Sequence, residues 1–289
     1  MLDKNVSRLF HIKLFDVYEA VFTLFLDRWL KDDARHQPPV SPRGPGTLPH
    51  DEPFQETIML ELRPFNSLGG AHHGWLDAHH HFSFAEYYDP KRMNWGNLRV
   101  WNDDVIAPGT GFPQHPHRDM EIITYVREGA ITHQDNLGNK GRTEAGDVQV
   151  MSAGTGIAHS EYNLEAKPTK IFQIWIIPNE SGLAPSWGAK PFPKGQREGF
   201  VTLASGKAGD DQSLRIRADA RLVAANLKAG ESAEYHLDHG RRAYLVPATG
   251  AIEVNGLRAQ ARDGVAVADE QVLRVTAVED SEIVLVDLA

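Results

Sequence analysis

The sequence predicts an all-β protein built from two β-barrel domains. From about residue 98 to the end, short apolar or alternating runs are separated by turn residues, and long amphipathic helical patterns are absent from this part of the sequence. Four of these runs are LRVWNDDVI (98–106), EIITYV (121–126), IFQIWII (171–177) and EIVLVDL (282–288). Short strands at such regular spacing are typical of β-sandwiches and barrels.

Two short internal matches indicate that one β-unit occurs twice. EGAI at 128–131 is matched by TGAI at 249–252, and AGDVQV at 145–150 resembles RDGVAV at 262–267. The two offsets are similar, which favours a repeated unit over chance matching of short strings. Two copies of one β-unit also account for the length of 289 residues.

Residues 1–58 differ from the rest of the chain. Residues 12–30 are apolar and compatible with a helix, but charged side chains interrupt them too often for a membrane span, and the segment lacks the features of a secretory signal. Residues 37–50 form a Pro/Gly-rich linker. We expect 1–58 to be a disordered, dispensable extension, even an upstream region translated from a misassigned start; a docked helix followed by a linker is the alternative.

The remaining chain divides near its middle. We expect an N-terminal barrel at 59–180 and a C-terminal barrel at 181–289.

The composition excludes several classes of function. The net charge of −9 and the pI near 5.8 give no basic footprint for nucleic acid. The absence of cysteine excludes disulfides, thiolate metal sites and cysteine nucleophiles, so any metal must be bound by histidine, carboxylate and water. We expect a cytoplasmic protein with neither a nucleic-acid nor a membrane partner.

Two pairs of potential metal ligands share one spacing. His115 and His117 lie two residues apart in GFPQHPHRDMEIITYV, and His159 and Glu161 do so in SAGTGIAHSEYN. Residues i and i+2 of a strand point to the same face, and turn signals between the pairs allow antiparallel strands to bring them together. Three imidazoles and one carboxylate would accept Fe(II), Ni, Mn, Cu or Zn, and would leave positions open for a substrate.

Other histidines are assigned structural roles. An isolated H-x-H is often a solvated strand face, but two paired clusters together favour a metal site. We interpret AHHGWLDAHHHF at 71–82 as an edge strand that packs through its aromatic residues, and we place His133 in solvent near a hairpin. In the second repeat His236 corresponds to His115, but the counterpart of His159 falls near Ala277. We therefore expect the C-terminal barrel to be metal-free.

These motifs resemble those of the cupins. Gly109, His115, His117 and Glu121 fit the pattern G-x5-H-x-H-x3-E of the first cupin motif. The stretch from Gly146 through His159 to Asn163 is similar to the second motif, with two additional residues. The strings MSAGTGIAHSEYN and HHGWLDAHHHFSFAEYYDP narrow the resemblance to the pirin family, and to its bacterial quercetinase-like members, over roughly residues 59–289.

The resemblance implies a bicupin of two jelly-roll-type barrels with one divalent metal in the N-terminal barrel. Its implied ligands are His115, His117, His159 and Glu161, with Fe(II) as the first expectation. Most cupins use the glutamate of the first motif, here Glu121, whereas pirins use the one that follows the last histidine. Strand parity allows Glu121 to face the same way, so the sequence leaves both glutamates open as the carboxylate ligand. We expect Glu161 to bind the metal and Glu121 to lie near it.

The resemblance also implies a function. Related pirins are linked to flavonol 2,3-dioxygenase activity, in which dioxygen opens the central ring of quercetin and carbon monoxide is released. Glu161 would be the catalytic base for the 3-hydroxyl proton, and an apolar barrel mouth would accept the flat rings. The alternatives are a regulatory protein that binds a transcription factor or metabolic enzyme, with the metal as a redox or structural element, and a different cupin reaction such as isomerisation or hydrolysis.

Overall fold

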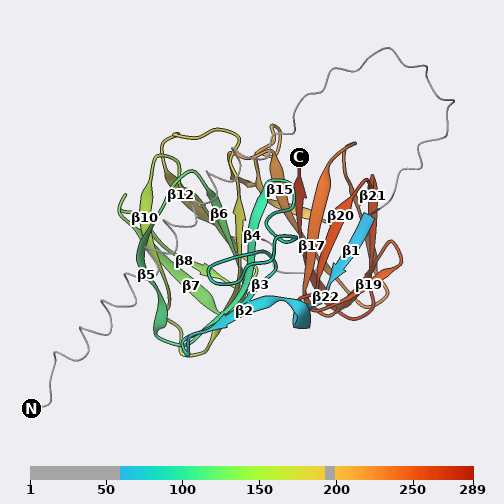
Figure 1. Cartoon of the computed structure of the whole chain (residues 1–289), viewed down its shortest axis with the longest axis horizontal. Helices are drawn as coiled ribbons and strands as arrows, with labels where there is room; N and C mark the ends of the chain where they lie inside the picture. The colour runs from blue at the N-terminus through green and yellow to red at the C-terminus, as the bar shows by residue number, and fades with distance from the viewer. Residues whose placement is uncertain (1–58, 193–198) are drawn as a thin grey trace, which may run out of the picture. The chain divides into compact units, whose positions relative to one another are not determined.

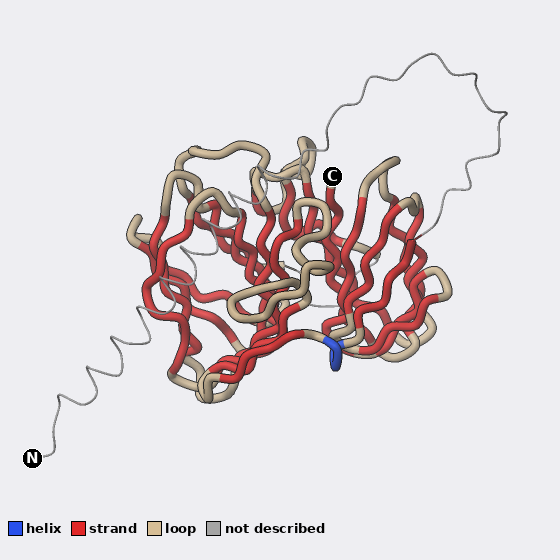
Figure 2. Tube along the Cα trace, in the orientation of Figure 1, coloured by secondary structure: helices blue, strands red, loops and turns tan. Residues whose placement is uncertain are grey.

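The computed structural model describes residues 59–192 and 199–289, and the regular secondary structure of these residues is almost entirely β-strand (Figure 2). The short 3-10 helix η1 (Phe65–Ser67) is the one helix among them. No helix within the described ranges is long and apolar enough to cross a membrane. The all-β fold predicted from the sequence is confirmed, while the extension predicted at 1–58 lies outside the described residues.

The first half combines a seven-stranded and a four-stranded sheet (Figure 1). Its strands are β2 (Gly69–His72), β3 (Leu76–His80), β4 (Leu98–Ile106), β5 (Thr110–His117), β6 (Glu121–Glu128), β7 (Ala130–Asp135), β8 (Lys140–Glu144), β9 (Val148–Ser152), β10 (Ile157–Asn163), β11 (Thr169–Ile176) and β12 (Ser186–Lys190). The larger sheet has the order β12-β9-β6-β11-β4-β3-β2, and the smaller one has the order β5-β10-β7-β8.

The second half repeats this arrangement. Its strands are β1 (Met59–Arg63), β13 (Val201–Ser205), β14 (Leu214–Arg215), β15 (Ala220–Leu227), β16 (Ser232–His236), β17 (Arg242–Thr249), β18 (Ala251–Val254), β19 (Leu257–Gln260), β20 (Gly264–Ala268), β21 (Val272–Ala277) and β22 (Ser281–Leu288). The order of its smaller sheet, β16-β21-β18-β19, matches that of the first half strand for strand, as the internal repeat predicts. The larger sheet, β1-β20-β17-β22-β15-β13-β14, matches from β20 to β15 and differs at its edges, where β13 and β14 pair in parallel. Gly129 and Gly250 occupy the same turn in the two halves, with φ of 78° and 75° that favour glycine.

Each large sheet has one edge strand that lies, in the sequence, on the other side of the predicted domain boundary at residue 180. β1 opens the described chain, but it pairs antiparallel with β20 of the second half, from Met59 opposite Ala268 to Arg63 opposite Gly264 (Figure 1). β12 follows residue 180, but it pairs with β9 of the first half. The pairing therefore crosses that division in both directions.

The two halves share one buried core. Trp101 and Phe172 of the first half and Tyr244 of the second are fully buried in it. The Trp101 ring lies 5.4 Å from that of Phe172 and 5.6 Å from that of Tyr244, measured between centroids. Aromatic side chains of this size contribute much of the apolar area that a core buries. We therefore expect the two halves to unfold together.

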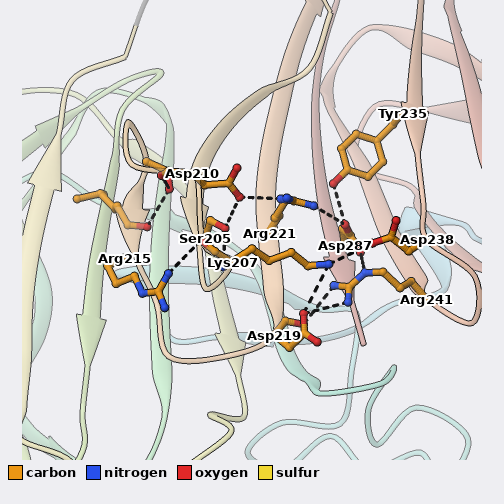
Figure 3. A network of polar contacts seen from close by, with 12 residues as sticks. Ser205, Lys207, Asp210, Arg215, Asp219, Arg221, Tyr235, Asp238, Arg241 and Asp287 are labelled. Carbon is orange, nitrogen blue, oxygen red and sulfur yellow. Dashed lines mark hydrogen bonds and ion pairs between the residues drawn. The ribbon is translucent and has the colours of Figure 1, made fainter.

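The interior of the second barrel is apolar, and charged groups gather at one of its ends (Figure 3). Asp287, which is 1% exposed, accepts hydrogen bonds from the Tyr235 hydroxyl at 2.8 Å and from Arg241 Nε at 2.5 Å. Arg221 Nε donates to Asp210 at 2.7 Å and extends the network along the sheet. A buried carboxylate needs such partners, because an unpaired charge would destabilise the fold.

One carboxyl group of the first barrel lies among apolar neighbours. Asp104 on β4 is 2% exposed and pairs with Ala78 and Ile171 of the adjacent strands. Its Oδ1 has no hydrogen-bond partner among the described residues. Burial, followed by the charges of Asp103 and Glu161, raises the pKa of Asp104 well above its usual value. The folded state therefore favours the protonated acid.

Replacement of Phe172 should test the shared core. Phe172→Ala should lower the free energy of unfolding by about 3–5 kcal/mol, because it removes a fully buried ring from a close-packed site. Urea unfolding followed by circular dichroism and tryptophan fluorescence should show one coincident transition. Tyr88→Ala, at a side chain that is 67% exposed, should change the free energy of unfolding by no more than about 0.5 kcal/mol. Two separate transitions would contradict a shared core.

Asp104→Asn should change how stability depends on pH. The unfolded Asp104 ionises near its usual pKa of 3.8, whereas the folded one keeps its proton to higher pH. The stability of the unmodified protein relative to the Asn variant should therefore be greatest at low pH and fall as pH rises above about 4. Urea titrations between pH 4 and 8 measure this difference, with the exposed Asp211→Asn as control. A difference that is constant with pH would rule out a raised pKa.

Candidate metal site

Three histidines from two neighbouring strands converge inside the first barrel. His115 and His117 lie on β5, and His159 lies on β10 directly opposite His115. The ring centroids are 4.8 Å apart for His115–His117, 4.5 Å for His115–His159 and 4.9 Å for His117–His159. One nitrogen of each ring lies within 4.8 Å of the others. The structure therefore brings together the three histidines that the sequence spacing singled out.

A bulge in β5 sets the direction of these side chains. The register runs from His159 opposite His115 to Glu161 opposite Phe112, so β5 has one more residue than β10 over this stretch. Bulges of this kind redirect side chains near functional sites, and Pro113 within this one has no N–H to leave unpaired. His115 Nδ1 donates to the Pro113 carbonyl at 2.7 Å, which leaves the lone pair of the neutral ring on Nε2.

The three imidazoles are held in the neutral form that binds metals. Burial lowers the pKa of His115, and burial together with the neighbouring imidazoles lowers the pKa values of His117 and His159 well below the usual range. His159 Nε2 is buried and has no hydrogen-bond partner among the described residues. A buried, unpartnered lone pair beside two more neutral imidazoles fits a divalent transition metal.

Glu161 lies next to His159, and amide and hydroxyl groups donate hydrogen bonds to its carboxylate. Its Oε1 accepts from Thr124 Oγ1 at 3.0 Å and from Gln149 Nε2 at 2.6 Å, and its Oε2 accepts from Gln173 Nε2 at 2.5 Å. Burial raises the pKa of Glu161 to about 7 despite these hydrogen bonds. Its carboxylate oxygen approaches His159 and His133, in a second group of potential ligands that overlaps the first.

A row of polar side chains across the large sheet supports this carboxylate. Gln173 pairs with Asn102 on one side and with Thr124 on the other, and Thr124 pairs with Gln149. Trp175 Nε1 donates to Gln173 Oε1 at 3.2 Å, so the Gln173 amide group is oriented to donate to Glu161. The spacing of the histidine pairs does not predict this row. Its signal is one glutamine inside each of two apolar strands, DVQVMS and IFQIWII.

Glu121 faces away from the histidines, so the expectation that it shares their face is wrong. Its Oε2 accepts from Ser152 Oγ at 2.7 Å and from the Arg217 backbone N–H at 3.1 Å. Thr124, three residues further along β6, points into the barrel toward Glu161, so Glu121 belongs to the opposite face. The alternation of side chains along β5 does not continue from His117 to Glu121, because the chain turns at Asp119, where φ is 46°.

His133 is buried inside the barrel, which corrects its placement in solvent. Its exposed fraction is 0%, and its Nδ1 lies 3.3 Å from His159 Nδ1. Its Nε2 lies 3.1 Å from Asp135 Oδ2, and its ring stacks on Trp187 with the planes 11° apart. The pair His133 and Asp135 has the same i, i+2 spacing on β7 as the two predicted pairs, and this signal was overlooked.

Two histidines of the His-rich tract have the structural roles predicted for them. In the His-rich tract, His80 Nδ1 lies 2.9 Å from Asn102 Oδ1, and His81 Nδ1 lies 2.8 Å from the Tyr244 hydroxyl. Neither belongs to a group of potential metal ligands among the described residues. His236, the counterpart of His115 in the second half, has a side chain that is 73% exposed.

Aromatic rings surround the histidines. Trp175 meets His117 edge-on at 5.0 Å between centroids, and Phe84 meets Trp175 edge-on at 5.5 Å. Phe112 lies 6.4 Å from His115, which is partly exposed. These surroundings are apolar and flat, and such walls bind aromatic ligands well.

The sequence matches two family models and is similar to several known proteins. The family model for pirin matches residues 61–176, and the model for the quercetinase C-terminal cupin domain matches residues 202–288. The chain is 73% identical over 232 residues to a Pseudomonas aeruginosa protein named "Putative quercetin 2,3-dioxygenase", which covers 80% of the chain and 100% of that protein. It is 44% identical over 231 residues to the quercetin 2,3-dioxygenase of Escherichia coli K12, and this match covers 80% of the chain and 99% of that protein.

The chain is also similar in sequence and fold to a solved structure of a bacterial pirin. The crystal structure of the bacterial pirin YhhW from Escherichia coli in complex with nickel(II) is 45% identical in sequence, with a TM-score of 0.75, and covers 80% of this chain and 99% of that one. The matched models, the identities and the shared fold lead to one conclusion: the chain belongs to the pirin family.

Proposed function

We propose that the chain is a metal-dependent dioxygenase that opens the central ring of a flavonol such as quercetin and releases carbon monoxide. The observation that carries the proposal is the buried, unpartnered Nε2 of His159 beside two neutral histidines and a carboxyl group whose pKa is about 7. The names of the P. aeruginosa and E. coli relatives support the reaction class. The cysteine-free sequence fits a cytoplasmic location, which we include in the proposal.

The chain's own residues would bind one divalent metal. We assign His115, His117, His159 and Glu161 as its ligands, with Fe(II) as the first expectation and Ni, Mn, Cu or Zn as alternatives. The nickel bound in the YhhW complex supports a divalent ion. When bound, the ion supplies positive charge that lowers the pKa of a nearby hydroxyl group.

Glu161 would accept the proton of the flavonol 3-hydroxyl. A base acts best when its pKa is near the working pH, and in the metal-free chain burial raises the pKa of Glu161 to about 7. Gln149, Gln173 and Thr124 hold the carboxylate in place before the substrate arrives, so little reorganisation is needed when the proton moves.

The aromatic residues would bind and orient the substrate. The Trp175 ring lies next to His117 and packs against Phe84, and the Phe112 ring lies next to His115. Stacking and edge contacts with these rings would hold a flat flavonol and exclude water from its central ring.

Metal reconstitution tests the proposal. The metal-free protein is loaded anaerobically with Fe(II), Ni(II), Mn(II), Cu(II) or Zn(II) in separate samples, and quercetin and air are then added. At least one metal should give loss of the flavonol absorbance with release of carbon monoxide. His117→Ala should reduce that turnover at least about 100-fold, because it removes a ligand. Stoichiometric metal binding without turnover would contradict the proposal and favour a binding or regulatory role.

Glu161→Gln tests the proposed base. The Gln side chain keeps the size of Glu161 but cannot accept the proton, so kcat should fall about 100-fold or more. Metal content is measured on the same samples by mass spectrometry, so that rates are compared per bound ion. Glu121→Gln is the matched control on the opposite face of the sheet and should retain near-normal kcat. Undiminished turnover in Glu161→Gln with metal bound would refute the base role.

A further inference from the structure

We propose that Asp135 and His133 form a hydrogen-bonded relay that fixes the tautomer and ring orientation of His159, and thereby sets how tightly the chain holds its metal. The inference rests on the metal site proposed above and goes beyond its ligands. The relay runs along the inner face of β7 and ends at β10. Its members are positioning residues, since His133 and Asp135 act on the ion only through His159.

The relay begins at a carboxylate that the chain holds in place. Asp135 ends β7, and its side chain is completely buried. Its Oδ1 accepts the backbone N–H groups of Leu137 at 2.9 Å and Asn139 at 3.0 Å, and its Oδ2 accepts the Asn139 side-chain amide at 2.8 Å. A carboxylate that accepts N–H groups of its own turn has little freedom to move.

The second step fixes the protons on the two imidazoles. The ionised Asp135 can only accept, so His133 Nε2, at 3.1 Å from Oδ2, carries a hydrogen. A neutral His133 then has its lone pair on Nδ1, which lies 3.3 Å from His159 Nδ1. His159 must donate across this contact, and its own lone pair therefore resides on Nε2.

The third step connects the relay to the metal. His159 Nε2 is the buried atom without a hydrogen-bond partner among the described residues, and its ring stands 4.5 Å from that of His115 and 4.9 Å from that of His117. His115 reaches the same tautomer through the Pro113 carbonyl. Outer partners of this kind orient ligand imidazoles, and their loss typically weakens metal binding about 10–100-fold.

Trp187 restrains the relay from its other side. Its ring stacks on His133 with centroids 4.8 Å apart. Gly141 makes room for it, because a Cβ at that position would lie 2.2 Å from Trp187 Cη2. Trp187 belongs to β12, the edge strand from beyond residue 180. That strand thus contributes to holding His133 in the plane that its hydrogen bonds require.

A direct ligand role for His133 is the competing explanation, because His133, His159 and Glu161 also form a compact group. The two explanations differ in the number of imidazoles around the ion. If His133 is a ligand, its removal lowers that number by one. If His133 belongs to the relay, the number is unchanged and only the affinity falls.

The test measures the Ni(II) affinity of the full-length metal-free protein by competition with a chelator. His133→Phe keeps the stacking on Trp187 but cannot accept from His159, and it should bind Ni(II) 10–100-fold more weakly. His133→Gln provides an amide oxygen and should recover part of that loss. Gln134→Ala, at an exposed neighbour on the outer face of β7, should bind as the unmodified protein does. X-ray absorption should find equal numbers of imidazole ligands in His133→Phe and the unmodified protein.

The possible outcomes distinguish failure of the relay hypothesis from failure of the proposed metal site. An affinity in His133→Phe within twofold of the unmodified protein would overturn the relay, and so would the loss of one imidazole ligand. Failure of the unmodified protein to bind Ni(II) would overturn the metal site and the relay together. Asp135→Asn, which keeps the shape but removes the charge, should weaken binding in the same direction. If His133→Phe does not fold, normal affinity in Asp135→Asn would overturn the relay.

Discussion

The burial of polar side chains inside the first barrel is the constraint on which the rest of the structure depends. A buried polar group destabilises the fold unless it has a hydrogen-bond partner. The row of side chains that includes Gln149 and Gln173 meets this requirement by donating to Glu161, and His133 meets it through Asp135. Among the described residues, His159 Nε2 has no hydrogen-bond partner, and neither has Asp104 Oδ1. At His159 a metal ion would satisfy the remaining lone pair.

The second barrel repeats the central strand order of the first but has a different interior. Where the first barrel has glutamine, threonine and histidine on its inner faces, the second has an apolar cluster. Two halves with one topology therefore differ in chemistry because of their side chains alone. The second half also supplies a partner for a buried carboxylate of the first half. Arg262 of the second half donates to Asp103 at 2.5 Å, and Arg127 of the first half pairs with the same carboxylate.

The sequence was most informative where a rule of local geometry applied. The i, i+2 spacing placed His115 with His117 and His159 with Glu161, because each pair lies within one unbroken strand. The same rule failed for Glu121, since the turn at Asp119 separates it from β5. His133 and Asp135 obey the rule but were not recognised as a pair. The pairing of β1 with β20 joins residues about 200 positions apart, and no local pattern predicts such a partner.

The central claim is that one ion is bound by the histidines of β5 and β10. Crystals of the protein loaded with Ni(II), measured at the nickel absorption edge, test it most directly. We expect a single anomalous peak between His115, His117 and His159, with the Nε2 atoms of His115 and His159 directed toward it. A peak between His133, His159 and Glu161 that excludes His115 and His117, or a peak in the second barrel alone, would contradict it.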